Sequence, residues 1–163
     1  RIVEKARGEI PLFNITTDLI VGFPGETEQE WQQTLDYVER TGFGQMHIFT
    51  YSQREGTKAA GLPGQIDTTI KKARSRQMHQ LAAQLKTKEL EKHLGKTYPV
   101  LWEQQPNREA GLWTGYTPHY HKMVSDDAGI RAAEVSDVTV NQVSEDGLKL
   151  LNHSRQRELY TCF

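Results

Sequence analysis

Residues 15–27 read Ile-Thr-Thr-Asp-Leu-Ile-Val-Gly-Phe-Pro-Gly-Glu-Thr, an apolar run that ends at a turn rich in glycine and proline. Residues 19–21 are apolar in succession, which predicts a strand covered on both faces, as in the parallel sheets of α/β proteins. Thr27 followed by Glu30 fits a capping box, so a helix is predicted to start at residue 28. The first amides of that helix would point back toward the turn. There they suit an anionic or polar ligand, although a turn shaped for packing has the same pattern.

Composition limits the class of protein. With 163 residues, 36% of them hydrophobic, and a mean hydropathy of -0.67, the chain can bury one moderate core or two small ones. The formal net charge of -1 gives no overall sign of a nucleic-acid binder, so any RNA site would be local. No apolar run is long enough to span a bilayer and no leader is recognisable, so a cytoplasmic protein without a membrane partner is expected. The single cysteine, Cys162, excludes a disulfide framework within one chain.

The segment after the first turn predicts a β-α-β unit. Apolar side chains recur at helical spacing through residue 40, and a second strand is predicted over residues 46–51. Residues 15–51 would therefore place two parallel strands side by side. Two strands alone leave unpaired edges, so partner strands must come from elsewhere, or the edges pair with a second copy as a dimer. Residues 1–8 are expected to be the end of a helix, which indicates a missing N-terminal part.

The loop of residues 52–57 leaves the second strand at its C-terminal end. In parallel α/β sheets and barrels, ligands bind at that end of the strands. Arg54 is therefore the charged residue of greatest interest in this loop. The alternative is an arginine that is solvated or bonded to Glu55.

One long helix is predicted over residues 67–94, with Asp67 as its N-cap and Gly95 as its stop. Along it, seven basic side chains outnumber three acidic ones; the basic residues are Lys71, Lys72, Arg74, Arg76, Lys86, Lys88 and Lys92. This stripe is either a solvated helix face or a track for an RNA backbone.

Beyond residue 96 the chain changes to short β-like runs separated by turns. They predict a small antiparallel barrel over residues 95–152, with strands at 98–103, 112–116, 121–124, 132–140 and 148–151. This region holds five basic and eight acidic residues, which argues against strong non-specific binding of nucleic-acid phosphates. His119 and His121 are close in sequence, but a metal site would need two further ligands nearby, so none is predicted. Residues 153–163 match no pattern.

Two segments of the chain resemble the radical S-adenosylmethionine methylthiotransferases. Residues 18–27, Asp-Leu-Ile-Val-Gly-Phe-Pro-Gly-Glu-Thr, closely resemble a strand and turn of that family. Tyr51-Ser52, followed by Arg-Glu-Gly-Thr at 54–57 and Ala59-Ala60, is similar to its next strand and loop. His47-Ile48-Phe49 resembles the branch that modifies tRNA N6-threonylcarbamoyladenosine. The chain departs from the family where prolines are frequent, at Thr50, Gln53 and Lys58, which predicts a less rigid loop.

The C-terminal half resembles the TRAM domain of the same enzymes, an RNA-binding barrel, through Gly115-Tyr116-Thr117 and Tyr120. The resemblance implies three parts: residues 1–94 as the C-terminal portion of a radical S-adenosylmethionine α/β barrel, residues 95–152 as a TRAM-like barrel, and residues 153–163 as a tail. It also implies S-adenosylmethionine and two 4Fe-4S clusters in the full-length protein, with an electron donor. Because clusters need several thiolates, the cluster cysteines would lie upstream of Arg1, and this chain alone should be inactive.

The resemblance also implies site residues. Ile20 and Gly22, with Tyr51 nearby, would hold the adenosine part of the cofactor. Arg54 would face the substrate, where its planar fork suits the threonylcarbamoyl carboxylate or a phosphate. The tRNA anticodon stem-loop would be bound by Arg74 on the basic helix, by Tyr116, Tyr120 and Trp113 stacking on unpaired bases, and by Lys122 at a phosphate. The aromatic residues would otherwise simply fill the barrel.

The implied reaction is methylthiolation of adenosine C2 beside the anticodon. Two sister activities stay open: the isopentenyladenosine tRNA enzyme and the enzyme that modifies an aspartate of a ribosomal protein. The sequence Arg-Glu-Gly-Thr at residues 54–57 argues against both sister activities. A non-catalytic RNA-binding module is the alternative of another class.

Overall fold

A computed structural model describes residues 2–107, 111–144 and 147–150 of the chain. They belong to two units, the first with residues 2–10 and 14–86, the second with residues 11–13 and the described residues from 87 onward. Each unit has a hydrophobic core of its own. The predicted α/β class is confirmed, since helices accompany a parallel strand pair.

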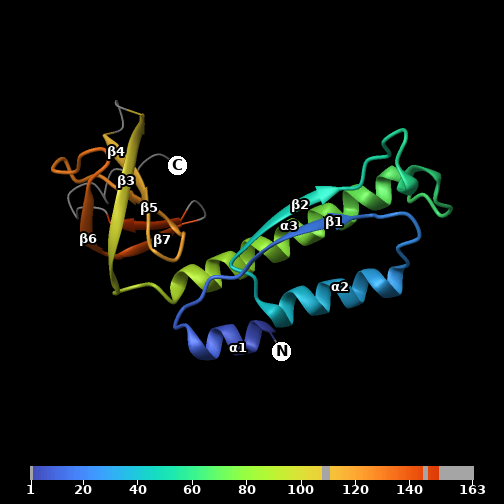
Figure 1. Ribbon diagram of the computed structural model, residues 1–163, viewed down its shortest axis with the longest axis horizontal. Coiled ribbons are helices and arrows are strands. Elements are labelled where there is room, and N and C mark those ends of the chain that lie inside the picture. The colour runs from blue at the N-terminus through green and yellow to red at the C-terminus, as the bar shows by residue number, and fades with distance from the viewer. Residues whose placement is uncertain (1, 108–110, 145–146, 151–163) are drawn as a thin grey trace, which may run out of the picture. The chain divides into compact units, whose positions relative to one another are not determined.

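The first unit contains the predicted β-α-β arrangement (Figure 1). Its elements are α1 (Ile2–Glu9), β1 (Thr16–Val21), α2 (Glu28–Thr41), β2 (Gln45–Thr50), the short 3-10 helix η1 (Lys58–Gly61) and α3 (Thr68–Glu91). β1 and β2 pair in parallel, with Leu19 opposite Ile48 and Ile20 opposite Phe49. The prediction of two neighbouring parallel strands is therefore correct. That they are part of a radical S-adenosylmethionine barrel stays a prediction.

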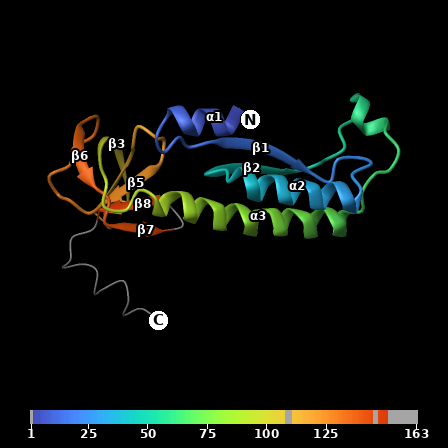
Figure 2. The same cartoon turned by 90° about the horizontal axis from the view of Figure 1, so that it is seen from below.

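Helices α2 and α3 cover the same face of this strand pair (Figure 2). The core between them combines Val21 of β1 with Trp31, Leu35 and Val38 of α2 and Met78 and Leu85 of α3. The opposite face is open in the described part of the chain, where Ile20 and Phe49 are 54% and 53% exposed. The expectation that the first strand is covered on both faces is thus wrong for these residues, because both helices lie on one side.

The helix boundaries follow the capping residues. Thr27 Oγ1 accepts a hydrogen bond from the Glu30 amide at 3.2 Å, and the Thr27 amide donates to Glu30 Oε2 at 2.8 Å, which confirms the capping box. Asp67 Oδ1 accepts from the Thr69 amide at 2.7 Å where α3 begins. The helix ends at Glu91 rather than Leu94, because residues 92–95 form turns before β3. Among the described helices, none is both long and apolar enough to cross a membrane.

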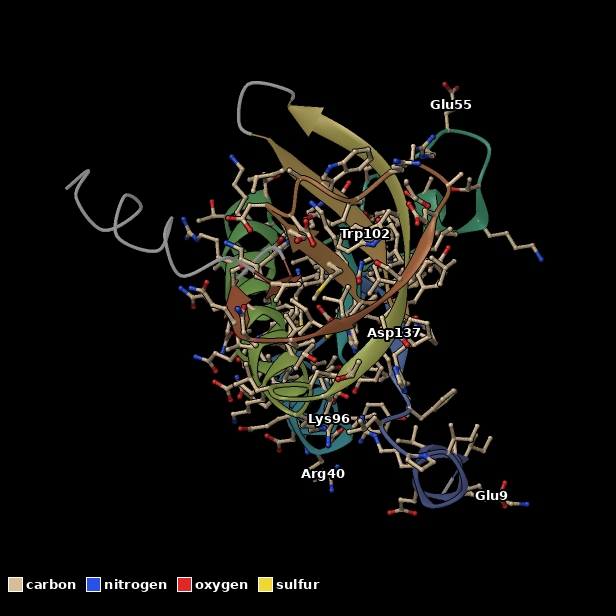
Figure 3. The ribbon with its side chains drawn as sticks, turned by 90° about the vertical axis from the view of Figure 1, so that its left-hand side faces the viewer. Glu9, Arg40, Glu55, Lys96, Trp102 and Asp137 are labelled. Atoms are coloured by element: carbon tan, nitrogen blue, oxygen red, sulfur yellow. The ribbon has the colours of Figure 1, made fainter. Side chains whose placement is uncertain are left out.

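The second unit is built on a six-stranded sheet in the order β6-β3-β4-β5-β8-β7. Its strands are β3 (Thr97–Asn107), β4 (Leu112–Tyr116), β5 (Lys122–Ser125), β6 (Val135–Thr139), β7 (Gln142–Ser144) and β8 (Gly147–Leu150). The predicted antiparallel pairing holds for four pairs, but β5 and β8 are parallel, so the sheet is mixed. Trp102 lies inside this curled sheet, where its Nε1 donates to Ser136 Oγ at 2.8 Å (Figure 3).

Candidate functional site

The ends of β1 and β2 lie side by side, and two predicted cofactor-binding residues meet there. The Tyr51 amide donates to the Val21 carbonyl at 2.9 Å. Gly22, directly after Val21, has a φ of +73°, and a Cβ at this position would collide with the side chain of Lys71. Glycine is therefore required at residue 22 both for its backbone conformation and for the close approach of Lys71. Ile20, by contrast, lies on the open face of β1.

Lys71 of α3 covers these strand ends. Its Nζ donates to the Tyr51 carbonyl at 3.4 Å and lies 5.8 Å from the centre of the Tyr51 ring. The ring of Phe23 packs edge-on against Tyr51, with the two centroids 5.3 Å apart. The Tyr51 hydroxyl is buried without a hydrogen-bond partner among the described residues. The strand ends therefore form an aromatic and cationic surface.

The turn between β1 and α2 is closed by a carboxylate of its own chain. The Gly22 amide donates to Glu26 Oε2 at 3.0 Å, and the capping box takes up further amides at the start of α2. The predicted place for an anionic ligand is thus occupied in part by Glu26. The same turn lines an open hollow of about 320 Å³ that is formed by Phe23, Pro24, Gly25, Glu26 and Glu30.

Arg74 does not lie on an exposed basic face. Only 6% of the residue is accessible, and its guanidinium donates to Glu26 Oε2 at 2.7 Å and to Glu28 Oε2 at 3.1 Å. It also lies 5.6 Å from the ring centre of Trp31. The expectation that Arg74 contacts an RNA backbone is corrected here, because its charge is used inside the first unit. The exposed cations of α3 include Lys72, Arg76 and Lys88.

Arg54 lies in the loop after β2 with an exposed side chain. Its carbonyl accepts a hydrogen bond from Thr57 Oγ1 at 2.8 Å, and Gln53 Nε2 donates to the Ala60 carbonyl at 2.8 Å. These bonds shape the loop although prolines typical of the family are absent from it. Arg54 and Tyr51 both follow the C-terminal end of β2, and Tyr51 comes three residues before Arg54 in the sequence.

The hairpin between β4 and β5 brings together the three residues of the second unit that were predicted to bind RNA. Tyr116 and Lys122 are register partners at the ends of the two strands. The rings of Tyr116 and Tyr120 lie 5.4 Å apart between centroids. Tyr120 is 79% exposed and has a φ of +63°, a conformation that bulky residues rarely adopt. This exposed, strained aromatic residue does not fill the core, whereas the third aromatic candidate, Trp113, is partly buried and packs against the core.

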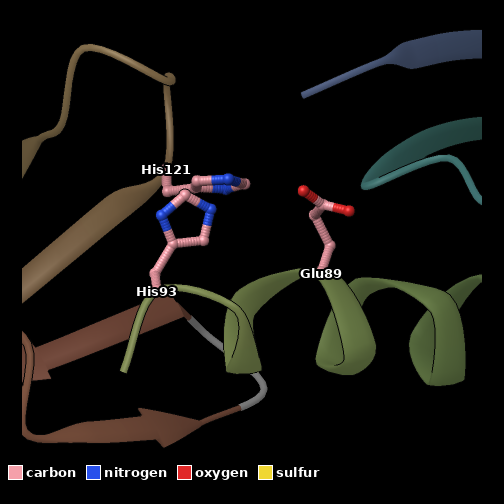
Figure 4. A group of neighbouring side chains, drawn as sticks. All are labelled: Glu89, His93 and His121. Atoms are coloured by element: carbon pink, nitrogen blue, oxygen red, sulfur yellow. The ribbon is translucent and has the colours of Figure 1, made fainter. Parts of the chain in front are cut away.

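The second unit also contains a cluster that the sequence did not predict (Figure 4). Glu89, His93 and His121 are 4%, 0% and 5% exposed, and each offers one ligand atom within 4.8 Å of the others. His93 Nδ1 lies 2.8 Å from the Tyr98 hydroxyl. Burial, and secondarily the nearby His119, lower the pKa of His93 to about 4, so the ring is neutral near pH 7. The spacing of Glu89 and His93, one helical turn apart, was the signal in the sequence.

The chain has curated relatives over most of its length, although no protein-family model matches it. It is 37% identical, over 148 residues, to the threonylcarbamoyladenosine tRNA methylthiotransferase of Thermotoga maritima. That alignment covers 91% of this chain and 33% of the relative. The chain belongs to the methylthiotransferase family.

Other methylthiotransferases match a shorter part of the chain. The ribosomal protein uS12 methylthiotransferase of Desulforamulus reducens is 39% identical over 114 residues, which cover 70% of the chain and 26% of that protein. A tRNA-2-methylthio-N(6)-dimethylallyladenosine synthase of Paenarthrobacter aurescens is 44% identical over 110 residues, or 68% of the chain and 21% of that protein. The chain thus spans between about a fifth and a third of the length of these relatives.

Proposed function

We propose that the protein containing this chain methylthiolates C2 of N6-threonylcarbamoyladenosine beside the anticodon of tRNA. The observation that carries the proposal is the extent of the similarity. Two threonylcarbamoyladenosine enzymes, from Thermotoga maritima and Chlamydia pneumoniae, match 91% and 90% of the chain. Relatives with the two sister activities match between 62% and 74% of it.

In this proposal the strand ends hold the nucleoside part of S-adenosylmethionine. Gly22 gives a ligand close access to the backbone, and the ring of Tyr51 offers an apolar surface. Arg54, exposed in the loop after β2, binds the carboxylate of the threonylcarbamoyl group or a phosphate. The exposed ring of Tyr120 and its neighbour Tyr116 stack on unpaired bases of the anticodon loop, and Lys122 meets a phosphate.

The described residues do not fit an iron-sulfur cluster. Such clusters are held by several cysteine thiolates, and the one cysteine of the chain, Cys162, lies outside the described residues. We therefore place the two 4Fe-4S clusters, and the contact with an electron donor, in other parts of the protein. The role of these 163 residues is to bind and orient the cofactor and the tRNA.

The experiment is complementation of a bacterial strain that lacks its threonylcarbamoyladenosine methylthiotransferase with the full-length gene that encodes this chain. Nucleosides of the tRNA are then measured by mass spectrometry. Restored 2-methylthio-N6-threonylcarbamoyladenosine supports the proposal. Methylthiolation of isopentenyladenosine or of the ribosomal protein instead would assign the sister activity. No modification, together with RNA binding by the purified protein, would favour a non-catalytic module.

Arg54 gives a second, residue-level test in the same strain. Arg54→Ala is expected to lower the modified fraction at limiting tRNA at least tenfold, because a charge-assisted bidentate contact contributes about 1.5–3 kcal/mol. Arg76→Ala, an exposed arginine on α3, is the matched control. If the Arg54→Ala protein modifies tRNA to nearly the wild-type level, Arg54 does not bind the substrate.

A further inference from the structure

Three metal-ligating side chains converge in the second unit from two different segments. Glu89 lies in the last turn of α3, His93 lies in the turns that follow the helix, and His121 directly precedes β5 (Figure 4). All three are at least nine-tenths buried. Their ligand atoms, one carboxylate oxygen and two ring nitrogens, are of the kind that metal ions bind.

The second observation is a buried ring nitrogen. His93 is fully inaccessible, and its Nε2 has no hydrogen-bond partner among the described residues. Its Nδ1 is held by the Tyr98 hydroxyl at 2.8 Å. If Nδ1 carries the proton and donates it to the Tyr98 oxygen, Nε2 keeps its lone pair for a ligand. This is the orientation that metal-bound histidines adopt, with the second nitrogen donating to an oxygen.

We propose that Glu89, His93 and His121 bind one divalent transition-metal ion, with Zn²⁺ as the best-suited ion. Two imidazoles and one carboxylate form a recognised zinc ligand set, in which a water takes the fourth position. Mg²⁺ and Ca²⁺ prefer sites made of oxygen ligands, so a site with two ring nitrogens selects against them. This ligand set contains no thiolate, so the site does not require any cysteine.

The present geometry is close to that of a filled site. Zinc bonds of about 2.1 Å at tetrahedral angles place ligand atoms about 3.4 Å apart, so atoms within 4.8 Å need to close by roughly 1 Å. Lys92 donates to Glu89 Oε2 at 2.6 Å, and this pairing leaves Oε1 for the ion. The side chain of Lys92 is half exposed, so it can turn into solvent if both oxygens bind the metal.

The ion would join the end of α3 to the hairpin between β4 and β5. His121 is next to Lys122, and the tight turn before it is closed by the Thr117 amide donating to the His121 carbonyl at 3.0 Å. The same hairpin carries Tyr116 and Tyr120. The ion would thus hold the hairpin in place. This inference does not depend on the proposed tRNA substrate.

The test uses the 163-residue chain with Cys162→Ser, so that the thiol cannot bind the ion. The chain is freed of metal with a chelator and titrated with Zn²⁺ in a calorimeter. One-to-one binding and a higher Tm with zinc are expected. Co²⁺ in place of zinc should give the visible absorption of a tetrahedral ion with nitrogen and oxygen ligands. Absence of one-to-one binding to the folded chain would overturn the site.

Variants then assign the ligands. Glu89→Gln, His93→Gln and His121→Gln are each expected to weaken zinc binding at least about 100-fold, while His79→Gln, at an exposed histidine of the same helix, should leave it unchanged. Circular dichroism checks that each variant folds. X-ray absorption of the zinc-loaded unmutated cluster gives a result that needs no variant, with two imidazoles expected in the coordination shell. Zinc binding that survives in the folded His93→Gln chain, or a shell without imidazole, would contradict the proposal.

Discussion

At the scale of single residues, Arg74 pairs with carboxylates inside the first unit instead of lying exposed to a nucleic acid. From the sequence it is one of seven cations on a helix, and nothing in that pattern separates it from Arg76. In the fold it fills a buried position between the turn before α2 and the ring of Trp31, with Glu26 as its partner. A helix position can be predicted from spacing, but the face that a neighbouring loop covers cannot. That Gly22 and Tyr51 lie at adjacent strand ends was predictable, because a strand end is a local feature, and their binding of a cofactor stays a prediction.

Arg74→Ala is expected to lower the free energy of unfolding of the first unit by about 3 kcal/mol, because it leaves the Glu26 carboxylate buried without its cation. The contact with Glu28 adds little, since that side chain is 70% exposed. Urea unfolding followed by circular dichroism measures the change. Arg76→Ala, at an exposed position, should shift it by less than about 0.5 kcal/mol. Equal effects of the two substitutions would show that the buried pair is not stabilising.

At the scale of elements, the capping box and the parallel pairing of β1 with β2 were predicted correctly, whereas the parallel pairing of β5 with β8 was not. The capping box at Thr27 and Glu30 involves residues three apart, so its pattern is visible in the sequence. The parallel contact of β5 with β8 joins residues more than twenty positions apart, and no short-range pattern encodes it. β7, with three residues, is too short to be found from alternation. The zinc ligands combine both cases: Glu89 and His93 are one turn apart, whereas His121 arrives only through folding.

The capping box gives the first unit a dependence on pH. The backbone amide of Thr27 lowers the pKa of Glu30 below its usual 4.5, so the folded state favours the ionised carboxylate. The contribution to stability is therefore present above pH 4.5 and lost as the pH falls through the lowered pKa. Glu30→Gln should flatten the fall of Tm between about pH 6 and pH 3, as measured by thermal unfolding. Parallel Tm curves for the variant and the wild type would contradict this role of Glu30.

The hairpin between β4 and β5 is the element in which RNA binding can be tested. Tyr120→Ala and Tyr116→Ala should each weaken binding of a tRNA anticodon stem-loop by about 1–3 kcal/mol, the usual contribution of one base stacked on an aromatic ring. Fluorescence anisotropy with labelled RNA measures the change. Tyr37→Ala, an aromatic residue that is 56% exposed on α2, is the control and should bind as the wild type does. Loss of binding in the control alone would move the RNA site to the first unit.

At the scale of the whole molecule, composition left open one moderate core or two small ones, and the described residues form two cores. The two units separate between residues 86 and 87, inside α3, rather than at its end. Helix α3 contains no glycine or proline that would mark a boundary there. The net charge of -1 also predicted that recognition of an anionic partner would rest on a few local contacts. The hairpin between β4 and β5 offers only a few such contacts, from one lysine and two tyrosines, and their binding of RNA stays a prediction.

The half-covered strand pair has a consequence for mutational tolerance. Ile20 and Phe49 contribute little to the core of their own unit, because more than half of each is accessible. Replacing Ile20 by serine should therefore leave the melting behaviour of this chain almost intact. If the same replacement abolishes turnover in the full-length enzyme, the lost contact belongs to whatever covers that face there. Position 20 thus separates what the chain needs in order to fold from what the enzyme needs in order to work.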